Sequence, residues 1–351
     1  MTATPSAPSA GHGKRPRKTL VQRGLALALG LSALACGEGF DPASQIRSLR
    51  VLGVHKDRPY AAPGESVTMR LVYHDGSPEA PRDLSLLWLT CVNPPGDLYW
   101  GCFEQFAALA EAGEAPTIAV GDTLTFDVPE DIVTSRPPPA PGNPQYGVGV
   151  AFFAICAGEL GFEVLDERSL PLVCRGPTGE PRGPDDFVAG YTMLYSFAGG
   201  FENENPIVTG FRIGGVDVEP DCIDAECVEA ESVPPDCDAD STDARCLPVC
   251  AGDCPELEVR PIVDPASAER DEVSAHYFGR DVWEQMWINY YVDGGKLVSS
   301  ERLLSDAQTG WYENHGAKFT PPAEAGPVRL WAVVHDNRGG ASFVRVTVQA
   351  Q

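Results

Sequence analysis

The amino-acid sequence predicts an all-β protein built from antiparallel sheets with short connections. Three observations support this prediction. Apolar and polar residues alternate with period two over several segments, Gly (36) and Pro (32) are both abundant among the 351 residues, and a weak repeat relates the two halves of the chain. Hydrophobic residues make up 43% of the chain, which suffices for sizeable cores. Gly and Pro at this frequency favour turns between short strands over long helices.

Alternation in the first half marks three strands, over residues 67–73, 123–128 and 146–156. Side chains of a strand point alternately to its two faces, so the apolar positions are expected to share one face and to line a core. These positions are Val67, Met69, Leu71, Tyr73, Leu124, Phe126, Val128, Val148, Val150, Phe152 and Ala154.

Alternation in the second half predicts two hairpins. Apolar residues recur at Val328, Leu330, Ala332 and Val334 and again at Val344, Val346 and Val348, on either side of the Gly-containing turn 336–340. Two alternating runs joined by a short Gly-bearing turn are typical of a β-hairpin. The sequence Asp293-Gly294-Gly295, which follows the apolar run 287–292, predicts a second hairpin.

Three weak matches in the same order relate the two halves. Residues 49–54 align with 211–216 at an offset of 162, residues 87–90 resemble 286–289, and 146–156 resemble 327–335. About seven short strands per ~120 residues with a Trp on a central strand are typical of an immunoglobulin-like sandwich. The stretch 328–348 resembles the last two strands of PKD-like and other bacterial Ig-like modules. This resemblance implies domains used for spacing or binding.

We therefore predict two tandem immunoglobulin-like β-sandwiches, over residues 47–200 and 201–351. The second is expected to contain a Cys-rich irregular insert, residues 217–256, which holds 13 acidic residues and one basic residue. So polar and acidic a segment is expected to lie on the surface, outside the sandwich core.

Residues 1–35 are predicted to be a signal peptide. Five basic residues precede an apolar run over 24–35, and no acidic residue occurs before Glu38. A helix of that length spans about 18 Å, too short to cross a hydrocarbon core of about 30 Å. A basic flank, a short apolar region and small residues at its end are typical of a secretory signal.

The segment Ser32-Ala33-Leu34-Ala35-Cys36 resembles a bacterial lipobox, with Ala and Leu in the reverse of the usual order. The resemblance implies diacylglyceryl transfer to the Cys36 thiol, cleavage after Ala35, and acylation of the new amine by a chain such as palmitate. Several acyl chains at about 0.8 kcal/mol per buried CH₂ form a stable membrane anchor. Gly37, rather than Asp, implies the outer membrane. Residues 36–46 are then the lipidated Cys and a tether. An ordinary cleaved signal, or a cytosolic protein with an apolar start, is the alternative.

The charge balance excludes one class of partner. The chain has 26 basic and 50 acidic residues and a net charge of −24. Removal of residues 1–35, with five basic and no acidic residues, leaves 21 basic and 50 acidic residues and a net charge of −29. So acidic a surface repels phosphates, and no nucleic acid partner is expected. No apolar run reaches the ~18 residues of a membrane span, so membrane contact is expected through the lipid alone.

The cysteine count agrees with export. With Cys36 set aside for the lipid, ten of the 11 cysteines remain, and an even number in an exported protein indicates disulfides. Neighbour pairing favours Cys91–Cys102 and Cys156–Cys174. The other six allow 15 connectivities, and their spacing does not choose among them. Zinc fits less well, because the cluster has no C-x₂-C and no nearby His. These six are Cys222, Cys227, Cys237, Cys246, Cys250 and Cys254.

Alternating aspartates in the insert suggest a cation site. Their D-x-D-x-D spacing is similar to the start of calcium loops, although the sixth position is Ser241 rather than Gly and the twelfth is Leu247 rather than Glu. The segment is more similar to thrombospondin type-3 repeats, in which aspartates and cysteines interleave. The alternative is a solvated acidic loop held by disulfides. The aspartates concerned are Asp236, Asp238, Asp240 and Asp243.

The sequence contains no motif for hydrolysis or nucleotide binding, since G-x-S-x-G, H-E-x-x-H and the P-loop are all missing. We therefore predict a non-catalytic envelope lipoprotein with an interaction, adhesion or structural role, no cofactor, and an envelope protein or glycan as partner. Exposed rings in Tyr99-Trp100 or Trp311-Tyr312 would suit such a partner, whereas packing over the sandwich ends is the simpler interpretation. A calcium-dependent binding module and an enzyme of unrecognised type are the other hypotheses.

Overall fold

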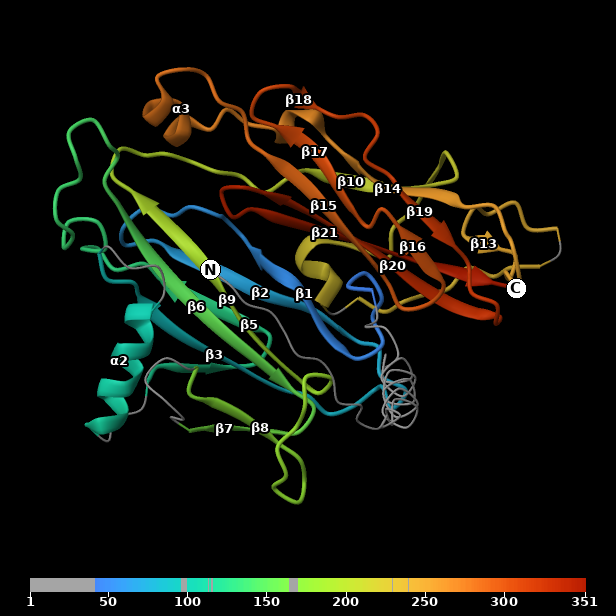
Figure 1. Ribbon diagram of the computed structural model, residues 1–351, viewed down its shortest axis with the longest axis horizontal. Coiled ribbons are helices and arrows are strands. Elements are labelled where there is room, and N and C mark those ends of the chain that lie inside the picture. The colour runs from blue at the N-terminus through green and yellow to red at the C-terminus, as the bar shows by residue number, and fades with distance from the viewer. Residues whose placement is uncertain are drawn as a thin grey trace, which may run out of the picture. The chain divides into compact units, whose positions relative to one another are not determined.

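Antiparallel β-strands dominate the computed structural model, as the alternation predicts (Figure 1). The structure describes residues 42–95, 100–112, 114, 116–163, 170–228, 230–238 and 240–351. The predicted signal peptide and Cys36 lie outside these described residues. Residues 43–351 form one compact unit.

The first half contains two facing sheets and a small ribbon. A three-stranded sheet has the order β1-β2-β5, a four-stranded sheet has the order β4-β3-β6-β9, and β7 pairs with β8. Their bounds are β1 (Leu49–Lys56), β2 (Ser66–Asp75), β3 (Ser85–Val92), β4 (Ile118–Val120), β5 (Thr123–Asp127), β6 (Tyr146–Cys156), β7 (Glu159–Phe162), β8 (Leu172–Arg175) and β9 (Phe187–Phe197).

The core of the first half lies between these two sheets. Trp88 on β3 is 1% exposed, stacks edge-on against Phe153 on β6, and donates its indole N–H to the Gly121 carbonyl at 3.0 Å. The predicted inward positions of β2 and β5 belong to this core, namely Val67, Met69, Leu71, Leu124 and Phe126, with Tyr73 packed against it. Alternation therefore predicted both the strands and their buried faces.

Strand β6 differs from the prediction, because it is buried on both faces. Ala151, Phe153 and Ile155 face the core between the sheets. The predicted inward residues Val148, Val150, Phe152 and Ala154 instead line a separate cluster with helix α2 (Trp100–Glu111), which the sequence analysis did not foresee. Phe103 and Phe106 of α2 contact the Phe152 ring at centroid distances of 5.4 and 5.7 Å. The helix covers what would otherwise be an exposed apolar face.

The second half also contains two sheets. One has the order β11-β10-β14-β19-β16, and the other has the order β12-β21-β20-β15-β17-β18, with β13 also paired to β21. The bounds are β10 (Val208–Ile213), β11 (Val216–Val218), β12 (Cys222–Ile223), β13 (Cys246–Leu247), β14 (Leu257–Val263), β15 (Met286–Val292), β16 (Lys296–Val298), β17 (Glu301–Asp306), β18 (Gly310–Trp311), β19 (Ala317–Thr320), β20 (Gly326–Asp336) and β21 (Ala341–Ala350). The helical segments are η1 (Asp224–Val228), η2 (Pro265–Ser267) and α3 (Glu272–Phe278).

One predicted hairpin is confirmed and the other is wrong. Strands β20 and β21 pair around the turn 336–340, where Asp336 Oδ1 accepts hydrogen bonds from the backbone N–H of Arg338 and Gly340. The segment 293–295 does turn, but the following β16 pairs with β19 in the other sheet. Gly295, at φ +76°, lets the chain approach β19, because a Cβ there would lie 2.4 Å from the Thr320 carbonyl oxygen.

Strand neighbours are the same in the two halves. Across the sheets, the order β10-β14-β19 repeats the order β1-β2-β5, and β17-β15-β20-β21 repeats β4-β3-β6-β9. The three segments of the weak sequence repeat fall on corresponding strands, β1 with β10, β3 with β15, and β6 with β20. The second half adds its own core between its two sheets, with Ile288, Phe319 and Val346 fully buried.

A fourth apolar cluster joins the halves. Leu52 and Val72 of the first half pack with Trp331 and Phe343 of the second, together with the insert. Ile46 belongs to the same cluster, is 1% exposed, and donates its backbone N–H to the Val292 carbonyl at 2.8 Å. Residues 44–46, assigned above to the tether, are therefore packed against β15.

Candidate functional site

The ten cysteines after Cys36 form five disulfides. Two of these join the neighbours that the spacing favoured, Cys91–Cys102 and Cys156–Cys174. In the cluster, where spacing left 15 possibilities, the chain joins consecutive cysteines, Cys222–Cys227, Cys237–Cys246 and Cys250–Cys254. Disulfides in this number are typical of a protein that folds in an oxidising compartment. Within the described residues, no helix is long and apolar enough to cross a membrane.

The first two disulfides attach peripheral elements to central strands. Cys91 lies on β3 and binds Cys102 of α2, while Cys156 at the end of β6 binds Cys174 of β8. All four half-cystines are at most 7% exposed. These two disulfides therefore attach helix α2 and the β7–β8 ribbon to the four-stranded sheet of the first half.

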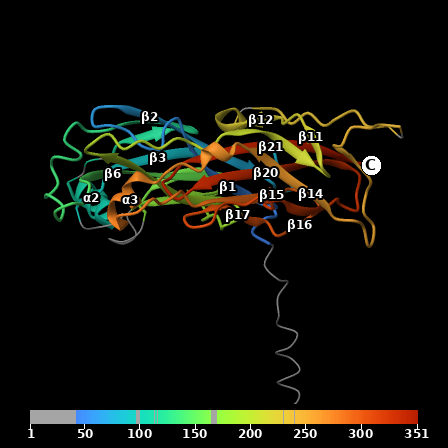
Figure 2. The same ribbon diagram turned by 90° about the horizontal axis from the view of Figure 1, so that it is seen from above.

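The acidic insert, residues 217–256, is attached to the second half mainly by strand pairing and a buried ion pair rather than by disulfides. Its disulfides join cysteines only 5, 9 and 4 positions apart, all within the insert. The insert is not wholly irregular, because β12 pairs antiparallel with β21 (Figure 2) and β13 pairs parallel with the same strand. These strands give the insert backbone hydrogen bonds to the second half.

A buried ion pair adds to this attachment. The Asp221 carboxylate accepts hydrogen bonds from Arg345 Nε at 3.3 Å and from Thr347 Oγ1 at 2.6 Å. The side chains of Asp221 and Arg345 are 4% and 8% exposed. Burial lowers the pKa of Arg345, and the neighbouring Asp221 opposes this effect. Removal of either partner would leave a charge in an apolar setting.

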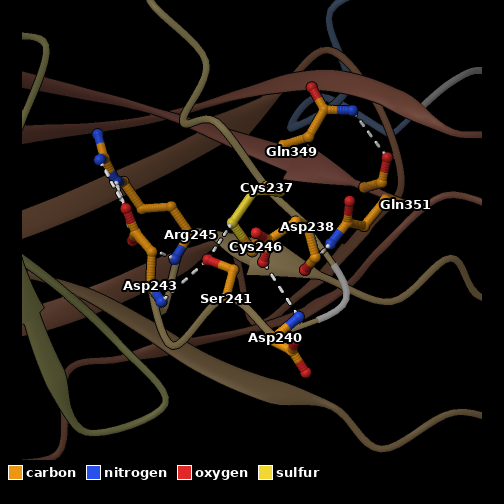
Figure 3. The surroundings of a disulfide bond; sticks show 10 residues. Cys237, Asp238, Asp240, Ser241, Asp243, Arg245, Cys246, Gln349 and Gln351 are labelled. Atoms are coloured by element: carbon orange, nitrogen blue, oxygen red, sulfur yellow. Dashed lines mark hydrogen bonds and ion pairs between the residues drawn. A yellow bond between two sulfur atoms is a disulfide. The ribbon is translucent and has the colours of Figure 1, made fainter.

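The aspartates proposed for calcium do not form a metal site, and Figure 3 shows that the side chains of Asp238, Asp240 and Asp243 do not point to a common centre. Asp243 accepts hydrogen bonds from Arg245, whose guanidinium Nη2 lies 2.7 Å away, and this contact lowers the pKa of the carboxyl group. Asp238 Oδ1 accepts the backbone N–H of Asp240 at 3.0 Å, and Asp236 and Asp240 are exposed. The described residues, which include all four aspartates, contain no group of three or more His, Cys, Asp or Glu side chains placed to hold a metal. Calcium binding stays a hypothesis from the sequence.

A network of buried charges, missed by the sequence analysis, lies beside the β20–β21 turn. Arg338 is hydrogen-bonded to Glu284 and forms an ion pair with Glu269, and its Nη1 donates to the Glu202 carbonyl at 3.0 Å. Burial raises the pKa of Glu284 to about 7, although Arg338 opposes the shift. This network ties the chain between the halves, residues 198–207, to the second half.

Lys56, at the end of β1, adds a second buried charge. It is 2% exposed and donates to the Met193 carbonyl at 2.9 Å, and its own carbonyl accepts a hydrogen bond from Asn205 at 2.6 Å. Burial lowers the pKa of Lys56 to about 8, and Asp336 opposes the shift. The side chains of Lys56 and Glu284 are both buried, and each is held by a polar contact within the fold. No local motif marks them, because their partners are distant in sequence.

Of the two aromatic pairs considered above, Trp311-Tyr312 does not form an exposed platform. Trp311 packs against the core of the second half, and the Tyr312 hydroxyl donates to Asp306. Trp100 begins helix α2, and Tyr99 lies outside the described residues. Packing is therefore the interpretation that fits Trp311.

Comparison with known proteins gives no family. No family model matches the chain, and no curated protein matches it. Among solved structures, the fibronectin(III)-like modules of Clostridium thermocellum CbhA are 8% identical, with 85% of this chain and 94% of that chain covered and a TM-score of 0.21. Dimeric latent PorU from Porphyromonas gingivalis is 10% identical, with 88% of this chain and 24% of that chain covered and a TM-score of 0.18. TM-scores this low support no inference about fold or function.

Proposed function

We propose that this protein is a non-catalytic lipoprotein of the bacterial cell envelope, anchored through Cys36 and exposing two tandem immunoglobulin-like sandwiches for an interaction or structural role. The observation that carries the proposal is the cysteine inventory. The ten cysteines after Cys36 are all paired, which leaves the lipobox-like Cys36 as the odd one. Disulfides and a lipobox belong to the same export route.

The strand arrangement supports the choice of two immunoglobulin-like units. The three-stranded and four-stranded sheets of the first half recur, with the same strand neighbours, within the larger sheets of the second half, and each half has its own apolar core. Antiparallel sandwiches of about seven strands are a common extracellular architecture. A fold alone does not assign a role, so the proposal does not choose among interaction, adhesion and a structural role.

The buried contacts between the halves support a rigid rather than a jointed protein. The apolar cluster between the halves and the Lys56 and Arg338 networks together fix the chain that connects them. A rigid body next to a membrane anchor suits presentation of a surface at a fixed distance from the lipid. The strong negative charge of the mature chain would also keep it soluble beside an anionic membrane.

The experiment that tests this proposal compares the wild type with Cys36→Ser in a Gram-negative host. We expect the wild type in the outer-membrane fraction, released only by detergent, and C36S as an uncleaved precursor or a water-soluble form. The matched control is Cys250→Ser with Cys254→Ser, which removes cysteines but keeps the anchor and should stay in the membrane fraction. Wild-type protein in the soluble fraction without detergent would contradict the proposal.

A further inference from the structure

A hollow lies between the loop after β1 and the chain after β9. Its volume is about 560 Å³, and residues 57–65 and 197–205 line it. A volume of this size falls within the ~300–1,000 Å³ range of small-ligand sites, which often form where separate structural units meet.

The walls of the hollow are acidic. Asp57, Glu202 and Glu204 line it and are exposed, and among the described residues none of the three has an ion-pair partner. The fourth lining carboxylate, Glu65, pairs with Arg58 at 3.2 Å, and Arg58 is the one cationic side chain among the lining residues. The lining therefore carries a net charge of −3, which favours a cationic ligand.

Three aromatic rings form an adjoining wall. Tyr60 lies 5.0 Å from Phe197, and Phe197 lies 5.5 Å from Phe201, between ring centroids. All three rings are half-buried, and the Arg338 guanidinium lies over the Tyr60 ring at 5.8 Å from its centroid, which leaves Phe197 and Phe201 to contact a ligand. Aromatic faces attract organic cations, and they also accept the apolar stem of an alkylammonium group.

A buried acceptor without a partner also lines the hollow. Asn203 is 5% exposed, and its Nδ2 donates to Asp336 Oδ2 at 3.2 Å, which orients the amide. The Oδ1 atom of Asn203 has no hydrogen-bond partner. A buried acceptor left unpaired costs free energy that a donor on a ligand, or a water that it holds, would recover. The Asp336 and Arg338 network behind Asn203 holds this wall in place.

We propose that this hollow binds a primary alkylammonium group. Unpaired carboxylates would hold the charge, the rings would contact the alkyl stem, and Asn203 Oδ1 would accept an N–H directly or through water. The group could belong to a free amine or to a lysine side chain of an envelope protein. The proposal stands independently of the lipid anchor, because it rests only on residues 57–65 and 197–205.

The test is calorimetric titration of the detergent-solubilised full-length protein at low salt. The probes are cadaverine, the blocked peptide acetyl-Gly-Gly-Lys-Gly-Gly-amide, and 1,5-pentanediol as the neutral match for cadaverine. We expect saturable one-to-one binding of cadaverine or of the lysine peptide, and no binding of the diol. Binding of both cations indicates a free-amine site, and binding of the peptide alone indicates a polypeptide partner. The absence of saturable binding by either cation overturns the proposal.

Two variants locate the site. Glu202→Gln with Glu204→Gln removes two charges from the hollow and should weaken binding by about tenfold or more. The charge-matched control is Asp253→Asn with Glu256→Gln in the insert, where both side chains are exposed, and it should leave the affinity within about twofold. Phe201→Leu should weaken cadaverine binding by about threefold while the protein stays folded by circular dichroism. Equal weakening in the insert control would attribute binding to net charge and overturn the site.

Discussion

The two halves of the molecule hold their added segments in different ways. In the first half, α2 and the β7–β8 ribbon are joined to central strands by buried disulfides. In the second half, the disulfides of the insert close only short loops, and strand pairing with the buried Asp221–Arg345 contact attaches the insert to β21. Loop entropy alone assigns about 3 kcal/mol to the first two disulfides and about 2 kcal/mol to the short ones, a small difference. What each disulfide connects therefore matters more than the length of the loop it closes.

The largest effect is expected from Asp221→Asn. The change leaves Arg345 buried without its carboxylate and should lower the free energy of unfolding by about 4 kcal/mol. Urea unfolding followed by tryptophan fluorescence measures it. Asp217→Asn is the control, because Asp217 is 60% exposed in its pair with Arg212, and it should leave the free energy of unfolding almost unchanged. Similar costs for the two variants would show that the insert is not held by the buried pair.

Removal of a connecting disulfide should come next. Cys156→Ala with Cys174→Ala should lower the free energy of unfolding by about 3 kcal/mol, because it frees β8 from the end of β6. Hydrogen exchange should show that protection is lost in β7 and β8 while β20 and β21 keep theirs. Loss of protection throughout the second half would mean that the disulfide does not act locally on the first half.

The free energy of unfolding should depend on pH through Glu284, in the network beside the chain between the halves, and this effect should be intermediate in size. The pKa of Glu284 is about 7 in the folded protein against 4.5 as its ordinary value, so the folded state binds the extra proton between these values. This stabilisation is complete below pH 4.5 and is lost as the pH rises through 7, because the unfolded state is already ionised there. Between pH 5 and pH 8 the wild type should lose about 2 kcal/mol that Glu284→Gln does not lose.

Urea unfolding of both proteins at pH 5, 6, 7 and 8 isolates this contribution, because every other titrating group is common to the two. The difference in unfolding free energy between wild type and Glu284→Gln should change steadily over that interval. Parallel profiles would show that Glu284 stays ionised beside Arg338.

The smallest effect is expected from Cys250→Ala with Cys254→Ala. This disulfide closes a four-residue separation within the insert, and its half-cystines are only partly buried, so its loss should cost at most about 2 kcal/mol. Urea unfolding without reductant measures this loss and compares it with the loss in the Cys156 and Cys174 variant. A larger loss here than there would reverse the comparison between the two halves.

Local pattern predicted the strands well where one face is buried, as at Val67, Met69 and Leu71. It did not predict which face of β6 meets the core, because α2 covers the second face and makes both apolar. The helix itself was missed, since its twelve residues follow Pro94-Pro95 and offer only a short apolar pattern. The passage of the chain from one sheet to the other after Gly295 was not predicted, because the turn sequence suits a hairpin equally well.

Features that depend on contacts between residues distant in sequence could not be predicted from the sequence. Lys56 and Glu284 are single charges in unremarkable surroundings, and only the folded chain brings them to Met193 and Arg338. The disulfide map of the insert was open for the same reason, because consecutive pairing is one of many allowed connectivities. The even count of cysteines after Cys36, by contrast, needs no structure and already indicates an oxidising compartment.

The central claim is that Cys36 is acylated and that the other ten cysteines are oxidised. Intact mass spectrometry of the protein extracted from membranes, alkylated in denaturant with and without prior reduction, tests both parts together. We predict a chain that begins at Cys36 and carries acyl groups, takes up no alkyl groups before reduction, and takes up ten afterwards. A chain that still begins at Met1, or one whose thiols are alkylated without reduction, would contradict the claim.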